Sequence, residues 1–256
     1  MNVDLFRRPT ALRARRAAAA TTLAAALGAA TLAGAPAHAQ ILPGQAAQTN
    51  PCGPIFIRNF YGPFDYRTQR GALQVVEDFH FTPEIEAGLR GRNGPIGGDI
   101  NYTLKASPNH HRALITLMQV SRRTKNEQIP GLEWPLECFF DRAIRFQKDD
   151  PIVRMLYAQY LTERNRRPDA VKQLDIALDL AGDNPFTHYN IGMLFADAAE
   201  WDRALKQAHK AMSLGFPRPE LADRLRQAGR WSEPAPAPAA ATAAAASAPA
   251  TAASRP

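Results

Sequence analysis

The sequence predicts an all-α fold in which a pair of antiparallel helices is repeated along the chain. Prolines 108, 151, 185 and 219 hold the same place in four successive segments, and the last two steps are each 34 residues. Small residues recur at the same spacing within these segments. Cap-type residues, which favour helix starts, stand directly before three of the four prolines. A period of this length is typical of stacked helical hairpins.

Residues 1–39 have the features of a secretory signal peptide. Five arginines precede an Ala-, Leu- and Thr-rich run that extends from Ala17 to about Ala35. The triplet Ala37-His38-Ala39 then marks cleavage before Gln40. An uncleaved membrane anchor is the alternative, but a run of Ala, Thr and Gly holds few strongly apolar side chains. We expect export to the periplasm, with secretion as the other outcome, and no membrane span after cleavage.

Loss of this segment changes the charge of the chain. The full sequence has 31 basic and 24 acidic residues, and residues 1–39 contain five Arg and one Asp. The remainder has 26 basic and 23 acidic residues, a net charge of about +3. Nucleic-acid binding is therefore not expected. The basic cluster at Arg164, Arg166 and Arg167 is interpreted as a solvated turn.

Residues 40–107 form an aromatic-rich amino-terminal segment without a sustained helical period. Thr82-Pro83-Glu84 predicts a short helix that runs to Gly91, and a second is expected from Asp99 to Ala106. Leu73 to Phe81 fits a strand or a helix. We expect the segment to pack on the repeats and bury its aromatics; the alternative is an exposed aromatic patch for a partner.

Residues 108–229 form the predicted repeats. Each proline is expected to start a helix, because its missing N–H would be unpaired there, and Ser107, Asp150 and Asn184 precede three of them. The expected helices span 109–121 and 134–147, 151–164 and 168–181, and 185–197 and 201–213. A final capping helix is expected from Pro219 to Ala228. The first step between prolines is 43 residues, so the first repeat carries an insertion around Lys125 to Trp134.

Small residues form three rows where the paired helices should cross. The rows are Ala143, Ala177 and Ala211; Ala170 and Ala204; and Ala158 and Gly192. Large apolar residues keep the same register beside them: Leu114, Tyr157, Ile191 and Leu225; Met118, Leu161 and Phe195; Phe140 and Leu174; and Phe146, Leu180 and Leu214. Close helix packing requires this alternation of small and large side chains.

These residues resemble the tetratricopeptide repeat (TPR) family. The run His188 to Gly192, followed by Phe195, Trp201, Ala204 and Ala211, is similar to a single TPR. The preceding segment is similar to a second TPR, and the residues that carry the similarity are Tyr157, Ala158, Ala170, Leu174 and Ala177. The first repeat departs from the pattern at Ile115 and Leu136. The resemblance implies a short right-handed solenoid of three repeats. Separately, residues 233–256 are rich in Ala and Pro, and this composition predicts a disordered tail.

The resemblance also implies that the concave face, lined by the first helix of each repeat, binds a peptide or protein. The residues it places there include Ile152, Met155, Gln159, Phe186, Tyr189, Met193 and Asp197. The Lys/Asn carboxylate clamp of some TPR proteins is absent from these places, so we expect an amphipathic helix or an extended apolar segment as ligand. The alternative is that the chain's own residues 73–107 fill the groove.

The sequence contains no recognisable nucleophile elbow, acid–base pair or metal motif, so we expect neither catalysis nor a cofactor. His110 and His111 are adjacent and would point about 100° apart on a helix, so packing explains them better than a metal. The leading hypothesis is a scaffold or adaptor in the cell envelope. The alternative is a metal- or small-ligand-binding accessory protein or a cryptic enzyme that uses His80, His110 and the inserted loop.

Cys52 and Cys138 are the only cysteines, and export would place them in an oxidising compartment. We expect a disulfide that ties the amino-terminal segment to the first repeat. Two unpaired thiols are the alternative.

Overall fold

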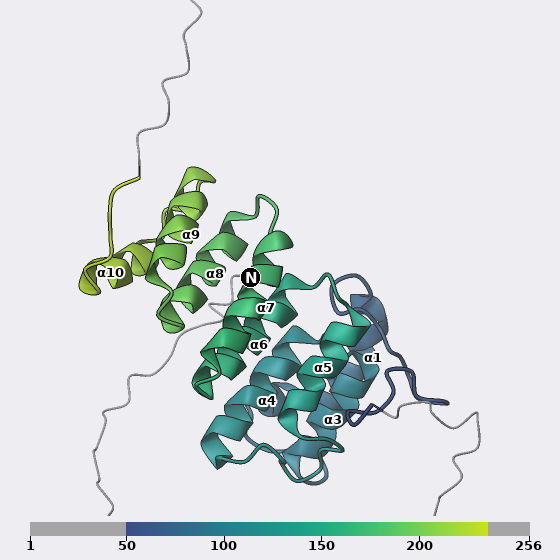
Figure 1. The fold of residues 1–256 in the computed structure, drawn as a ribbon. Coiled ribbons are helices and arrows are strands. Elements are labelled where there is room, and N and C mark those ends of the chain that lie inside the picture. Colours follow the sequence, from purple (N-terminus) through teal and green to yellow (C-terminus); the bar gives the residue numbers. More distant parts are fainter. Residues whose placement is uncertain (1–49, 235–256) are drawn as a thin grey trace, which may run out of the picture.

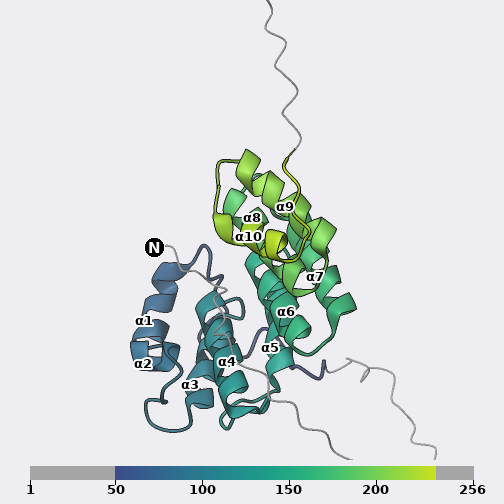
Figure 2. The same cartoon turned by 90° about the vertical axis from the view of Figure 1, so that its left-hand side faces the viewer.

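A computed structural model describes residues 50–234, and this part of the chain is all-helical, with ten helices and no strand. The predicted signal peptide and almost all of the predicted tail lie outside the described residues. The helices follow one another through the molecule, with the amino-terminal segment at one end and the last three helices at the other (Figures 1 and 2). No helix within residues 50–234 has the length and apolar character needed to cross a membrane.

The amino-terminal segment contains three helices, α1 (Arg70–His80), α2 (Pro83–Glu86) and α3 (Ile96–Ala106). The ambiguous stretch from Leu73 is thus helical. Helix α2 ends well before the predicted Gly91, because Gly88 adopts a left-handed conformation and the Leu89 N–H bonds back to the Glu84 carbonyl. Helix α1 packs on α3, and both α2 and α3 pack on α4.

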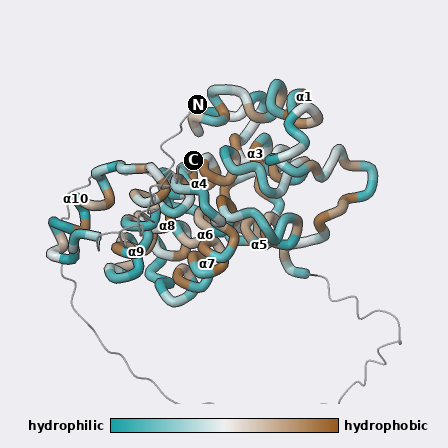
Figure 3. The backbone as a smooth tube through the Cα atoms, turned by 90° about the horizontal axis from the view of Figure 1, so that it is seen from above, coloured by the Kyte–Doolittle hydropathy of each residue, from teal (hydrophilic) through white to brown (hydrophobic). Residues whose placement is uncertain are grey.

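The repeat region contains seven helices. They are α4 (His111–Thr124), α5 (Leu136–Phe146), α6 (Pro151–Glu163), α7 (Arg167–Asp179), α8 (Pro185–Asp197), α9 (Trp201–Ser213) and α10 (Pro219–Gln227). The closest pairs are α6 with α7 and α8 with α9, and α10 packs on α8 and α9. Hydrophobic residues gather around α4, α6 and α7 (Figure 3). The three small-residue rows lie in this core, where each alanine named above is buried.

Two of the three predicted helix caps are present. The Asp150 carboxylate accepts the N–H groups of Ile152 and Val153, and the Asn184 side chain accepts that of Thr187. The prediction for Pro108 is wrong, because residues 107–110 form a turn and α4 begins at His111. There His110 Nδ1 accepts the Ala113 N–H in place of Ser107.

The inserted loop packs against the start of α3. A Cβ on Gly97 would lie 2.4 Å from the Pro130 carbonyl oxygen, and one on Gly131 would lie 2.4 Å from the Gly98 nitrogen. The two backbones meet directly, and only glycine permits this approach. Helix α3 begins at Ile96 and includes Gly97 and Gly98, whereas the sequence predicts a start at Asp99.

The residues around Cys52 are fixed on α5. Cys52 and Cys138 form a disulfide, with their sulfur atoms 2.02 Å apart. The buried Arg142 donates to the Cys52 carbonyl at 3.2 Å and lies 4.2 Å over the ring of Trp134. Arg145 donates to the Gly53 carbonyl at 3.0 Å. Burial lowers the pKa of Arg142 to about 10, so it stays protonated at neutral pH.

A second attachment joins the amino-terminal segment to the start of α6. Asn109 donates from Nδ2 to the carboxylates of Asp65 at 2.8 Å and Asp150 at 3.0 Å. Arg67 Nη2 lies 2.9 Å from Asp65 and 3.1 Å from Asp149, and His111 Nε2 lies 2.8 Å from Asp150. The carboxylate that caps α6 thus also holds the first repeat.

The first prediction concerns acid stability. Burial favours the neutral form of Asp65, but hydrogen bonds from Arg67 and Asn109 outweigh burial and lower its pKa from 3.8 to about 2. A depressed folded-state pKa contributes stability that is present above the unfolded value and is lost as the pH falls toward 2. Asp65→Asn should therefore be less stable at pH 7 and show a shallower fall in stability between pH 4 and 2. Urea unfolding across this range measures the slope, and an unchanged slope would contradict the assignment.

Candidate functional site

The residues predicted to line the groove lie on one side of α6 and α8, but several are buried. Met155 and Tyr189 are only 2% and 6% exposed and belong to the core, and Gln159 is buried as well. Ile152, Phe186, Met193 and Asp197 are partly buried. Met155 and Tyr189 therefore help to maintain the fold and are not open to a ligand.

The chain's own carboxyl-terminal part covers the stripe on α8. The Phe216 ring packs edge-on against Tyr189 and Phe186, with ring centroids 5.3 and 5.9 Å away. The Tyr189 hydroxyl donates to Glu220 at 3.3 Å, and burial raises its pKa to about 12. Arg224 pairs with Asp197 at 2.7 Å. Ile152, Phe186 and Met193 are the apolar positions of the stripe that stay partly exposed.

At the first repeat, α2 occupies the corresponding face of α4. Arg112, Thr116 and Val120 stand 43 residues before Met155, Gln159 and Glu163, and therefore hold the same register places. Arg112 pairs with the Glu86 carboxylate, and Thr116 Oγ1 donates to the Glu86 carbonyl at 2.8 Å. Helix α2, which belongs to the segment 73–107, thus covers this face of α4.

The histidines of the metal-binding hypothesis lie in separate environments. His110 is fully buried; Nδ1 caps α4 and Nε2 lies 3.0 Å from Glu77. Burial lowers its pKa, so the ring is neutral at pH 7. His80 contacts Asp99 at 3.0 Å and stacks on Tyr102. Between residues 50 and 234, no group of three or more His, Cys, Asp or Glu side chains is arranged to hold a metal ion.

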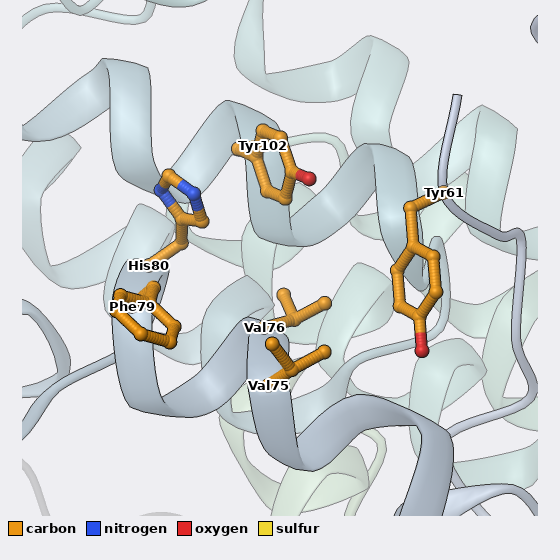
Figure 4. Close-up of a pocket in the computed structure, with 6 residues that line it drawn as sticks. All are labelled: Tyr61, Val75, Val76, Phe79, His80 and Tyr102. Carbon is orange, nitrogen blue, oxygen red and sulfur yellow. The ribbon is translucent and has the colours of Figure 1, made fainter. Parts of the chain in front are cut away.

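An exposed apolar trough lies between α1 and α3. It has a volume of about 330 Å³ and is lined by Tyr61, Val75, Val76, Phe79, His80 and Tyr102. In Figure 4 the valines and Phe79 run along α1, with Tyr102 across from them and Tyr61 at one end. Tyr61, Val75 and Phe79 are 43%, 49% and 51% exposed, whereas Val76 is buried beneath them.

Contacts within the chain hold the walls of this trough in place. The Tyr61 hydroxyl donates to the Ala72 carbonyl at 2.9 Å. Tyr102 is stacked on His80 at a centroid distance of 3.9 Å and tilted against Phe60 at 5.0 Å. The Arg92 guanidinium lies 4.9 Å over Phe79. These contacts within the chain hold Tyr61, Phe79 and Tyr102 in place around the trough.

From the sequence, an exposed aromatic patch in this segment is only the alternative prediction, and Leu73 to Phe81 fits a strand or a helix. Once the stretch is a helix, Val75 and Phe79 fall four residues apart on one face, while Leu73 and Val76 point to the core. Comparison of the chain with family models, curated proteins and solved structures found no match. The described geometry defines a helical array with an apolar trough exposed between α1 and α3.

Proposed function

We propose that the protein is a TPR-type scaffold or adaptor of the bacterial cell envelope that binds a protein or peptide partner. The 34-residue spacing of the small-residue rows supports the repeat assignment, because all of these alanines are buried where the helices pack. The packing of α6 on α7 and of α8 on α9 agrees with successive helix pairs of a solenoid. Under this proposal, residues 50–107 form a helical cap on the first repeat.

The exposed trough carries the proposal. Apolar side chains that remain about half exposed in a folded chain mark contact sites, especially when they gather in a hollow. Val75 and Phe79 contribute apolar surface that the fold leaves open to solvent, and burial under a partner would remove it from water. Ile152 and Met193, at the concave face, offer a second and smaller apolar contact.

The proposed location rests on two observations. The first 39 residues have the charge and apolar pattern of a cleaved leader, and Cys52 and Cys138 form a disulfide, which persists in oxidising compartments. Together they favour the periplasm. The acidic and basic residues that remain after cleavage nearly balance, so a protein partner suits the surface better than nucleic acid.

In-cell cross-linking tests the proposal. A photoreactive amino acid at position 79 should form a discrete adduct that mass spectrometry can identify, because Phe79 faces the open trough. Adding Val75→Asp should lower the adduct yield about tenfold, since desolvating an unpaired carboxylate costs on the order of 1–3 kcal/mol or more. The matched control is the same amino acid at Ile176, an exposed apolar residue on α7. No adduct at position 79, or equal adducts at both positions, would contradict the proposed binding surface.

A further inference from the structure

Helix α2 rests on α4 in the way that a bound peptide would. The Arg112 guanidinium donates two hydrogen bonds to the Glu86 carboxylate. One runs from Nε to Oε1 at 2.6 Å, and the other runs from Nη2 to Oε2. Thr116 reaches the Glu86 carbonyl, and Arg123 donates to the Gly88 carbonyl. A Cβ on Gly88 would lie 3.1 Å from a methyl of Val120, so the turn sits closely on α4. Arg112, Thr116 and Val120, which hold successive groove places on α4, thus all contact residues 86–88.

This stretch offers a defined combination of chemical groups. Ile85 is buried against the core, and the next residue, Glu86, supplies the carboxylate. Arg112 and Arg123 present two cations on the same face of α4, so an anionic group is complementary to the surface. The groove at this end therefore fits an apolar residue followed by an acidic residue within one helical turn.

The segment that covers α4, residues 82–91, should separate from it more readily than a longer helix of the repeats would. Helix α2 has only four residues, and the left-handed Gly88 ends it. Gly88, Gly91 and Gly94 lie in the connection between α2 and α3, so this connection has little intrinsic stiffness. Leu89 is exposed, and Ile85 is the only residue of α2 that is buried in the core. Segments with few buried apolar contacts are the ones that open locally at the lowest free energy.

We propose that residues 82–91 are a built-in occupant of the groove, and that a partner segment with an apolar residue followed by Glu or Asp binds α4 by displacing them. This inference rests on the proposed role of the concave face in partner binding. Displacement uncovers Arg112, Thr116 and Val120 and extends the accessible groove beyond Ile152. The partner's carboxylate replaces that of Glu86 on Arg112.

The test uses the mature full-length protein and a fluorescein-labelled peptide with the sequence of residues 82–92. Glu86→Ala removes the carboxylate that holds α2 while leaving Ile85 in place. Fluorescence anisotropy should show that this variant binds the peptide at least tenfold more tightly than the wild type does. Because Glu86→Ala alone can leave α2 seated, Ile85→Ser with Glu86→Ala is measured as a second, more open variant. Circular dichroism establishes that each variant keeps the helix content of the wild type.

Two matched controls assign the binding to α4. The same peptide with Gln in place of Glu86 should bind the opened variants at least tenfold more weakly, and so should the original peptide when Arg112→Ala is added. Equal affinity of the wild type and both opened variants, or binding that survives Arg112→Ala, would overturn the inference. Failure of the position-79 cross-link would instead count against the proposed function, since that experiment does not involve α2 or α4.

Discussion

Removal of the Cys52–Cys138 disulfide should lower the free energy of unfolding by roughly 4 to 5 kcal/mol. The bond closes a loop with a sequence separation of 86, and loop-closure entropy gives a value of this size for the unfolded chain. Cys52→Ser with Cys138→Ser removes the cross-link and leaves the polar clamp from Arg142 and Arg145 in place. Urea unfolding of the variant and the wild type, both under oxidising conditions, measures the difference.

Reduction supplies the control for this experiment. A thiol reductant should bring the wild type down to the stability of the double serine variant and leave that variant unchanged. A loss below about 1 kcal/mol, well under the entropic value, would mean that the unfolded chain is already constrained near residues 52 and 138. A non-reduced digest should recover the two cysteines in one linked peptide pair.

Gly192→Leu should be the most damaging single substitution in the repeat region. A Cβ at Gly192 would lie 2.5 Å from Leu221 Cδ2 and 3.1 Å from Gln207 Cβ, so the site where α8, α9 and α10 meet has no room for a side chain. Ala can be accommodated by a shift of the Leu221 side chain, but Leu needs the helices to separate. Overpacking of this kind costs about 1–3 kcal/mol or more.

Thermal unfolding by circular dichroism measures the effect of Gly192→Leu. The matched control is Gly71→Ala on α1, where an added Cβ meets nothing within 4 Å. This control should be neutral or slightly stabilising, because Ala is favoured over Gly within a helix by up to about 1 kcal/mol. If Gly192→Leu melts with the wild type, the proposed helix crossing is misplaced.

The local chemistry of the repeats made their helices predictable. Pro185 after the cap Asn184, and Trp201 before the small residues of α9, place both helices of that repeat where the structure has them. Pro108 follows the same pattern in the sequence, yet α4 begins three residues later at His111. The later start comes from tertiary contacts. Asn109 donates hydrogen bonds to Asp65 and Asp150, which are far away in the sequence, so no local pattern reveals them.

The candidate sites were less predictable than the helices. The register placed Tyr189 on an open face, but it carries no information about Phe216 and Glu220, which cover that residue. The trough was missed for a different reason: Leu73 to Phe81 is rich in residues compatible with either secondary structure, so the spacing of Val75 and Phe79 had no meaning until α1 was known. Burial by distant segments decided both outcomes.

The bond between residues 52 and 138 also determines how the protein would respond to a pulling force. When the two ends of the chain are drawn apart, tension passes through the sulfur atoms and bypasses the residues between them. At roughly 3.5 Å per residue, a separation of 86 conceals about 300 Å of contour length. Helices α1 to α4 and the contacts of α2 with α4 lie inside this shielded length. Tension applied through the termini would therefore unravel the part of α5 that follows Cys138 together with α6 to α10, and would leave α2 packed on α4.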